Sequence, residues 1–426
     1  MSLTKKEQTF IILATSIGSA VEWYELFLYV YWAPLISKMY FCADGDFVGS
    51  MKTLFVFFIG FLARPIGGLI FGHMGDKLGR KISFARSIIL MTIPSFAMGL
   101  IPNQIGIFAP IILCILRFLQ GLPAGGELPG AMCYLAECAP PKRRSLVCSF
   151  TFFGPQIGVI ISMLECYFLH KYMSEKALFS WGWRLSFIIG GLFGLIGFYL
   201  RHKLKESPAF HNLVNSKKVL HHPIKEAIFR HKKDIISGFF VSFLDVIGFY
   251  LFSIFLGIYF YKIIKISPSE NLLIAAGLMI FSTLTLPLLG MLGDKFKSKN
   301  LLMLSSLGMI IFAVPFYFSA SHGSVMYTTI FEIILVLLLN VQYAILPCLI
   351  AELFPTSTRY TGIGMSFNFA DSLIGGITPV LALFLTSLIG DIATFVLLIC
   401  IGAIVTSVAL FFIKERRLHT INVDPV

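Results

Sequence analysis

Long apolar segments dominate this chain and follow one another from end to end. Twelve of them, separated by charged or Pro/Gly-rich breaks, fall at 10–36, 48–72, 82–101, 105–136, 145–170, 183–200, 235–262, 271–291, 301–320, 325–351, 361–388 and 391–413. About 20 apolar residues in a helix cross the hydrocarbon core of a bilayer. Only 13% of the 426 residues are charged, whereas soluble proteins carry roughly a quarter. The sequence therefore predicts an all-α membrane protein with twelve transmembrane helices and excludes a water-soluble enzyme.

The basic residues indicate how these helices are oriented. Of the 34 Lys and Arg, 24 lie in alternate breaks and at the two ends of the chain, and only seven lie in the other breaks. Cytoplasmic loops carry an excess of Lys and Arg, so both termini are predicted to be cytoplasmic. The net charge of +12 is explained by this topology, and no nucleic-acid partner is expected.

One long basic stretch, at 201–233, divides the chain into two parts of similar length. We expect a six-helix bundle at 1–200, a cytoplasmic linker at 201–233 and a second six-helix bundle at 234–413. A short cytoplasmic tail is expected at 414–426.

Two motifs recur at nearly the same spacing. Gly-His-Met-Gly-Asp-Lys-Leu-Gly-Arg-Lys at 72–81 returns weakly as Gly-Met-Leu-Gly-Asp-Lys-Phe-Lys-Ser-Lys at 290–299, which is 218 residues later. A second motif returns 215 residues later, with Ala136-Glu137, Pro140 and Arg144 matched by Ala351-Glu352, Pro355 and Arg359. Such repetition indicates an internal duplication. Paired six-helix repeats are typical of proteins that bind a solute at the membrane midplane between their halves.

The same motifs resemble the signatures of a known superfamily. Gly72-X-X-X-Asp76-X-X-Gly79-Arg80-Lys81 resembles the loop signature of the major facilitator superfamily, and Arg117-X-X-Gln120-Gly121 resembles its second motif. A narrower resemblance is to the metabolite:proton symporters, which include proline/betaine, 2-oxoglutarate, citrate and shikimate permeases. It is carried by residues 21–25, 63–68, 120–127, 206–210, 351–355 and 359–362. That family usually has Asp where this chain has Glu25, whose carboxyl group reaches one methylene further.

The resemblance implies a major facilitator fold of two six-helix halves in a bacterial cytoplasmic membrane. It implies import of a small polar organic solute with a proton by alternating access. Zwitterions such as proline or betaine rank slightly ahead of di- and tricarboxylates such as 2-oxoglutarate or citrate, and export by proton antiport is a further alternative. The partners would be the solute, the proton and membrane lipid around a monomer, with a proton gradient as the energy source and no cofactor.

Charged residues inside the predicted helices are candidates for proton coupling. An ionisable group near the bilayer centre costs about 2.5–3.5 kcal/mol, so each one needs a partner or a function. Glu22 and Glu25 lie three residues apart and share a helix face, where their repulsion favours protonation of one of them. Arg117 and Glu127 lie in the fourth helix, and a carboxylate that alternates between a proton and an arginine partner is a simple coupling device. A static ion pair or a brace between helices is the alternative for each residue.

Polar and aromatic side chains from both halves are candidates for solute binding. Arg64 could bind a carboxylate through two parallel hydrogen bonds. Aromatic faces opposite a carboxylate suit a quaternary ammonium group. Each side chain could equally hold two helices together by hydrogen bonds. The candidates are Tyr24, Arg64, Gln120, Asp245, Tyr250, Asn340, Gln342, Asn368 and Asp371.

The repeated charged motifs are candidates for a cytoplasmic gate. The resemblance implies that Asp76 and Arg80 lock the two halves together in one state, and a network of charges and helix-end dipoles can form and break in this way. The candidate gate residues are Asp76, Arg80, Glu137, Arg144, Asp294, Glu352 and Arg359. Retention of the basic residues for topology alone is the alternative.

Motifs for other chemistry do not occur in the sequence. There is no GxxxxGK[ST] loop for a phosphate-driven pump and no HExxH zinc motif. Most of the eight cysteines lie in apolar runs, where a thiol behaves as a small apolar side chain. Neither catalytic residues nor a metal site are therefore expected.

Overall fold

The computed structural model describes residues 3–41, 46–102, 106, 108–255 and 268–413. Within these ranges twelve helical spans are long and apolar enough to cross a membrane and no strand occurs, which confirms the predicted all-α class. The main helices are α1 (Lys5–Tyr40), α2 (Asp46–Lys77), α3 (Arg80–Gly99), α4 (Phe108–Cys138), α5 (Arg144–Tyr172), α6 (Glu175–Ala177), α7 (Trp183–His202), α8 (Pro208–Asn215), α9 (Pro223–Arg230), α10 (Lys232–Val241), α11 (Phe243–Tyr250), α13 (Pro268–Lys295), α14 (Ser298–Ser321), α15 (Val325–Leu353), α16 (Arg359–Ala370), α17 (Gly376–Ile389) and α18 (Asp391–Phe412).

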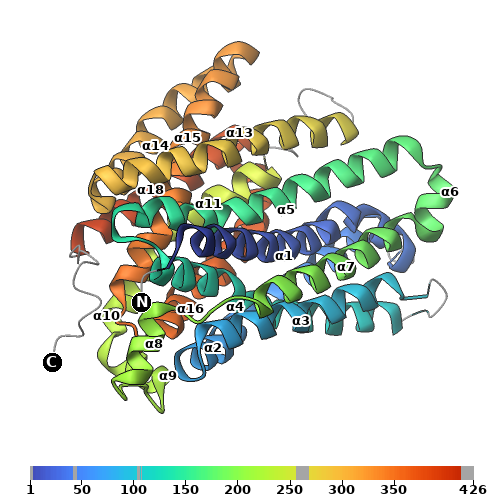
Figure 1. Ribbon diagram of the computed structural model, residues 1–426. Helices are drawn as coiled ribbons and strands as arrows, with labels where there is room; N and C mark the ends of the chain where they lie inside the picture. The colour runs from blue at the N-terminus through green and yellow to red at the C-terminus, as the bar shows by residue number, and fades with distance from the viewer. Residues whose placement is uncertain (1–2, 42–45, 103–105, 107, 256–267, 414–426) are drawn as a thin grey trace.

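The spanning helices form two bundles. In the first, α1 packs against α5, α2 against α4 and α3 against α7; in the second, α14 packs against α15 and α18. The bundles meet where α5 packs against α13 and α15, and where α2 and α4 pack against α16. Figure 1 shows α8, α9 and α10 at one end of the molecule and α6 at the opposite end. We call the first of these the linker end.

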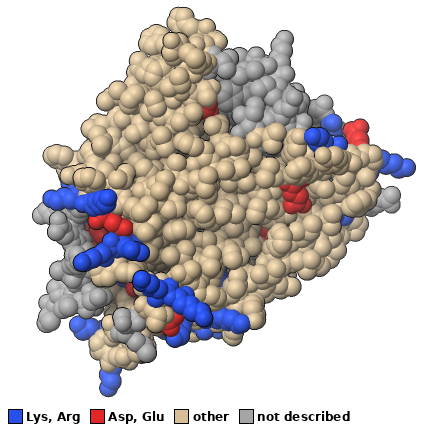
Figure 2. All heavy atoms as spheres, turned by 45° about the horizontal axis from the view of Figure 1, so that its top comes forward, with Lys and Arg blue, Asp and Glu red and all other residues tan. Residues whose placement is uncertain are grey.

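The surface between the two ends is apolar. Ile93, Leu304 and Phe384 are each more than 60% exposed, and many other large apolar side chains share this exposure. Figure 2 shows most Lys and Arg at the linker end, a second group at the opposite end and a broad band almost free of charge between them. Such a band is unfavourable in water and suits the hydrocarbon core of a bilayer. The chain is therefore a multi-pass membrane protein.

The predicted linker holds two short helices at the linker end. Ser207 caps α8 by accepting a hydrogen bond from the Phe210 N–H at 3.1 Å, and Pro208 occupies the first helical position. The start of the linker differs from the prediction, because α7 continues to His202 and Arg201 is fully buried. Arg201 is held inside the bundle by an ion pair with Glu127 of α4. The predicted tail at 414–426 lies outside the described residues.

Helices α2 and α4 approach each other through glycines. A methyl group on Gly121 would lie 2.0 Å from the backbone oxygen of Gly60, and one on Gly125 would lie 2.1 Å from that of Arg64. Small residues let membrane helices pack backbone against backbone. The contact therefore fixes the position of Arg64 relative to α4.

Replacing Gly121 with Ala should destabilise the protein by about 1–3 kcal/mol, because the added methyl group overlaps a backbone oxygen that has little room to move. Gly277→Ala in α13 is the matched control, since nothing lies within 4 Å of a carbon added there. Thermal unfolding in detergent should show a lower midpoint for Gly121→Ala only. Equal midpoints would contradict a tight contact between α2 and α4.

Candidate functional site

A buried ion pair joins the two bundles at the centre of the molecule. Nη1 of Arg64 in α2 donates to Oδ2 of Asp371, which directly follows α16. The hydroxyl of Tyr250, at the end of α11, donates to the other oxygen of Asp371 at 3.1 Å. Asp245 lies one and a half turns before Tyr250 and within electrostatic range of Asp371. All four side chains are buried.

Aromatic rings surround this ion pair. The guanidinium carbon of Arg64 lies 4.4 Å from the ring centre of Phe61 and 5.7 Å from that of Trp23. Phe61 in turn packs edge-on against Tyr250 at 5.7 Å, and Trp23 against Phe249 at 4.9 Å. These rings come from both bundles, and their faces attract cations.

Tyr250 and Asp371 of the second bundle lie where an α-helix changes to a π-helical turn. Single π-helical turns follow directly after α11 at Leu251–Phe255 and after α16 at Asp371–Gly375. Turns of this kind inside a helix occur often at functional sites. A methyl group on Gly375 would lie 2.4 Å from the Tyr250 ring, so the glycine lets Tyr250 reach Asp371. We call Trp23, Phe61, Arg64, Asp245, Phe249, Tyr250 and Asp371 the central cluster.

Polar atoms of both kinds remain available in the central cluster. Arg64 Nη2 and Trp23 Nε1 are buried donors, and Asp245 Oδ1 is a buried acceptor, with no hydrogen-bond partner among the described residues. A buried polar group without a partner costs about 1–3 kcal/mol. A solute that carries both a positive and a negative group could satisfy these atoms together.

A small cavity extends from Arg64 into the first bundle. It has a volume of about 10 Å³ and is bordered by Glu22, Arg64, Arg117 and Gln120 among others. A cavity of this size with several polar partners can hold one water molecule. Glu22 and Glu25, although three residues apart, therefore contact different surroundings.

Glu25 and Arg117 are connected through two intermediate side chains. The Ser95 hydroxyl of α3 donates to Glu25, and Gln120 Nε2 donates to Ser95 Oγ at 2.6 Å. Arg117 Nη1 donates to Gln120 Oε1 at 2.6 Å and Nη2 to the Leu26 carbonyl at 3.3 Å. Within the described residues Arg117 has no carboxylate at ion-pair distance. Any change in the charge of Glu25 would reach Arg117 through this chain of hydrogen bonds.

The two repeated aspartates each cap a helix of the opposite bundle at the linker end. The Asp76 carboxylate accepts from the N–H groups of Tyr360 at 3.2 Å and Thr361 at 2.8 Å, in the first turn of α16. Asp294 accepts from Ser145 at 2.8 Å and Leu146 at 3.3 Å, in the first turn of α5. Unpaired N–H groups and the positive end of a helix dipole favour a carboxylate at such a position.

An arginine–glutamate network reinforces these caps. Nε and Nη2 of Arg80 donate to the two oxygens of Glu137 at 3.1 and 3.0 Å, and Arg80 also pairs with Asp76 at 3.0 Å. Arg359 of the second bundle donates to Glu137 at 2.7 Å. Arg80 also donates to the Thr356 carbonyl of the second bundle. The bundles are thus closed against each other at the linker end.

Glu206, in the connection after α7, holds the start of α3 in this network. Its carboxylate accepts from the N–H groups of Arg80 at 3.0 Å and Lys81 at 3.2 Å. Gly79 before them has φ +118°, and a methyl group there would lie 2.3 Å from the Glu206 carboxylate. Burial raises the pKa of the Glu206 carboxyl, and the N–H of Ser207 and the charge of Arg80 partly oppose the shift.

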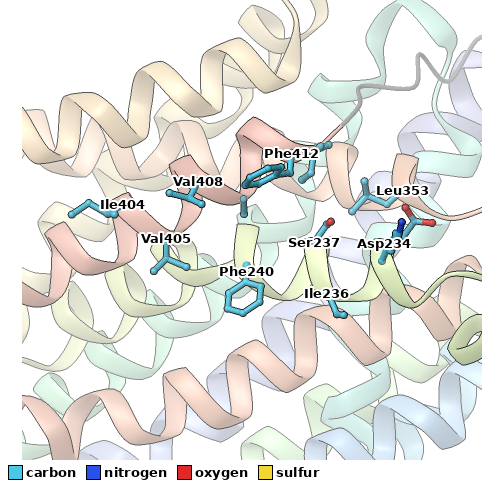
Figure 3. A pocket seen from close by; sticks show the side chains of 12 residues that line it. Asp234, Ile236, Ser237, Phe240, Leu353, Ile404, Val405, Val408 and Phe412 are labelled. Atoms are coloured by element: carbon cyan, nitrogen blue, oxygen red, sulfur yellow. The ribbon is translucent and has the colours of Figure 1, made fainter.

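A large pocket lies away from these residues. Figure 3 shows it between α10 and α18, lined by apolar side chains including Phe240, Val408 and Phe412. Its volume is about 870 Å³, but it contains no residue of the central cluster. Among the described residues, no group of three His, Cys, Asp or Glu side chains could hold a metal ion.

Comparison with known proteins decides the family. The family described as Sugar (and other) transporter matches residues 11–423, nearly the whole chain. The chain is a major facilitator transporter. It is 31% identical over 385 residues to the glycine betaine/proline/ectoine/pipecolic acid transporter OusA of Dickeya dadantii (strain 3937), covering 88% of this chain and 77% of that one. Family membership makes it a secondary transporter and not an enzyme.

Two further comparisons agree with this family. The transporter is 29% identical over 424 residues to the proline/betaine transporter of Salmonella typhimurium (strain LT2), covering 96% of this chain and 84% of that one. Its fold matches the proton:xylose symporter XylE bound to 6-bromo-6-deoxy-D-glucose with a TM-score of 0.84, 16% identity and 97% of each chain covered. At this identity the structural match shows the major facilitator fold alone.

Several predicted site residues of the transporter lie outside the central cluster. Tyr24 donates to Glu165 of α5 within the first bundle, and Gln342 donates to Ser305 and Ser306 of α14 within the second. Two other predicted residues bind neighbouring helices: Asn340 donates to Thr285 at 2.7 Å, and Asn368 donates to the Gly125 carbonyl. Two more lie at the linker end, where Glu352 accepts from the Cys348 thiol at 3.6 Å and Arg144 is half-buried at the start of α5.

Three residues that hold predicted residues in place were not themselves predicted. Ser95 connects Glu25 to Gln120, Glu206 caps α3, and Arg201 pairs with Glu127. The position of Glu206 within the family-like stretch at 206–210 was a usable signal. Nothing in the local sequence distinguishes Ser95 from other helical serines.

Asp76→Asn should open the linker end of the transporter, because an amide loses the charge that holds two N–H groups and Arg80. Hydrogen bonds to charged groups contribute about 1.5–3 kcal/mol, so closure should weaken about tenfold or more. Alkylation of Cys133, which is buried beside Glu137, reports this opening in a variant whose other seven cysteines are replaced by serine. Its rate should rise about tenfold.

Glu175→Gln, at the opposite end of the molecule, is the matched control and should leave the Cys133 rate unchanged. An unchanged rate in Asp76→Asn would show that its cap does not hold the gate.

Proposed function

We propose that this transporter imports a small zwitterion of the proline or betaine type together with a proton. The observation that carries the proposal is the central cluster, where a buried arginine and two buried aspartates lie side by side among aromatic rings. The names of the relatives from Dickeya and Salmonella support the same class of solute.

In this proposal the solute replaces the ion pair between Arg64 and Asp371. Its carboxylate binds the Arg64 guanidinium, whose Nη2 is already an unused donor. Its ammonium group lies near Asp371 and Asp245 and against the rings of the cluster. A quaternary ammonium has no N–H to donate, so carboxylates and ring faces are the partners that suit it.

Proton coupling in this proposal depends on Glu25 and Arg117. The proton binds Oε2 of Glu25, which then becomes a donor, so the hydrogen bond from Ser95 to this oxygen must rearrange. That change reaches Gln120 and then Arg117, which borders the same cavity as Arg64. Protonation would therefore alter the electrostatic field at the solute site.

Alternating access requires the linker end to open and close. The caps at Asp76 and Asp294 and the network around Glu137 form the closed gate, which separates when the bundles rock apart. By the positive-inside rule the linker end and both termini face the cytoplasm of a bacterial cell. The transporter acts as a monomer with the proton gradient as its energy source and no cofactor.

A dicarboxylate such as 2-oxoglutarate is the second candidate solute. Arg64 and Arg117 both border the small cavity and interact electrostatically, so two carboxylates could bind one arginine each. The presence of Asp371 and Asp245 beside Arg64 favours the zwitterion.

Uptake into proteoliposomes tests the class of solute. An imposed inside-alkaline pH gradient should drive accumulation of labelled betaine, with no accumulation in vesicles without a gradient. Gradient-driven accumulation of 2-oxoglutarate instead would select the second candidate. Betaine efflux driven by the opposite gradient, without uptake, would indicate antiport and overturn the proposal.

Glu25→Gln should abolish gradient-driven accumulation, because an amide can neither take up nor release the proton. Counterflow, in which labelled solute exchanges for unlabelled solute without net proton movement, should remain. Glu332→Gln is the control, since Glu332 is a buried carboxyl of α15 outside the central cluster. Accumulation by Glu25→Gln at the wild-type level would remove Glu25 from the coupling.

A further inference from the structure

A second buried ion pair lies inside the first bundle, closer to the linker end than the central cluster. Nη1 of Arg201 in α7 donates to Oε1 of Glu127 in α4 and, at 3.0 Å, to the Phe84 carbonyl. The Ser87 hydroxyl of α3 donates to the same oxygen of Glu127. Both charged side chains are fully buried. Neither the solute site nor the gate network contains this pair.

The pair repeats the arrangement around Glu25 further along the same helices. Ser87 precedes Ser95 by two turns on α3, and Glu127 follows Gln120 by two turns on α4. Both steps lead toward the linker end, where α3 begins and α4 ends. The first bundle therefore contains two polar layers, each with a glutamate held by a serine of α3.

Glu22 lies between the two layers. It is one turn from Glu25 on the side of the linker end, and it borders the water-sized cavity. It is within electrostatic range of both Glu127 and Arg201, as well as Arg64. Glu22 Oε2 and Glu127 Oε2 are buried with no hydrogen-bond partner among the described residues.

Tyr360 of the second bundle covers the inner layer. Its hydroxyl donates to the Gly126 carbonyl at 2.7 Å. A methyl group on Gly130 would lie 2.2 Å from the hydroxyl oxygen of Tyr360. Tyr360 is in electrostatic range of Glu127 and Arg201. Its own N–H is bound by Asp76 of the gate. Separation of the bundles at the linker end would therefore withdraw Tyr360 and give water access to Glu127.

We propose that Glu127 is the inner proton station and that Arg201 is the residue that positions it. The proposal rests on the proton symport proposed above. The Glu22 carboxyl passes its proton through water to the Glu127 carboxylate and becomes ionised. When the gate opens and Tyr360 withdraws, Glu127 gives the proton to cytoplasmic water and its carboxylate pairs again with Arg201, which stays cationic.

The groups that face Glu127 fit this assignment. They are Arg201 of α7, Ser87 of α3, Glu22 of α1 and Tyr360 of α16. The cation stabilises the carboxylate, the nearby Glu22 opposes two simultaneous negative charges, and the tyrosine excludes water while the gate is closed. A proton is thus released only on the side where the gate is open.

Proteoliposomes with labelled betaine test the relay. Glu127→Gln should retain counterflow within about twofold of the wild type and lose gradient-driven accumulation by tenfold or more. Arg201→Gln should lower gradient-driven accumulation and change its dependence on internal pH, because Glu127 loses the cation that positions it. Glu332→Gln is again the matched control and should behave as the wild type in both assays.

The double variant Glu127→Gln/Arg201→Gln guards against a folding defect, because it leaves no unpaired buried charge. It should keep counterflow and lose accumulation. Loss of counterflow in the double variant as well would show that the pair is a structural brace and overturn the relay. Wild-type accumulation by Glu127→Gln would overturn the relay while leaving symport intact. Absence of accumulation in the wild type, with counterflow present, would overturn symport itself and the relay with it.

Discussion

A charge buried in a bilayer needs a partner, and this requirement determines how the two bundles of the transporter meet. Arg64 finds Asp371, and Arg359 finds Glu137, in each case across the interface between the bundles. Breaking such a pair without replacing it leaves an uncompensated charge and costs several kcal/mol. The bundles can therefore separate only where a solute, a proton or water takes over the role of the lost partner.

The rest of the fold holds these charges in place. Glycine contacts fix α2 against α4, so that Arg64 and Arg117 border one cavity. Tyr250 and Asp371 form a hydrogen bond next to the π-helical turns that follow α11 and α16. At the linker end, the duplicated aspartates cap helices across the interface in both directions. Rigid contacts inside each bundle and replaceable polar contacts between bundles are the arrangement that rocking motion needs.

Much of this architecture could be predicted from the sequence, because the lengths of apolar segments and the repeated motifs can be identified from short stretches of the chain. The twelve helices followed from their runs, and the repeat at Asp76 and Asp294 pointed to equivalent positions that the structure shows as equivalent caps. Partners far apart in the chain could not be read in this way. Arg64 and Asp371 are 307 residues apart, and only the packing of the helices joins them.

Helix rotation explains the other differences. Tyr24 is adjacent to Glu25 in the sequence but lies on another face of α1, where its hydroxyl donates to Glu165 of α5. Arg201 follows the last residue of an apolar run and is predicted to begin a loop, yet α7 continues two residues beyond that run, to His202, and Arg201 lies inside the bundle. Neither the rotation of a helix nor its last turn is determined by hydropathy alone.

The pair between Arg64 and Asp371 also means that the empty transporter carries its own internal competitor. Both ends of this competitor are tethered, so its effective concentration is high and a solute with a single charge displaces only one end, leaving the other unpaired. A solute must match both charges at the right separation to displace both ends at once. Selectivity would then come from this bivalent exchange, at the expense of affinity, and the same tethered groups would help to expel the solute once the bundles have moved.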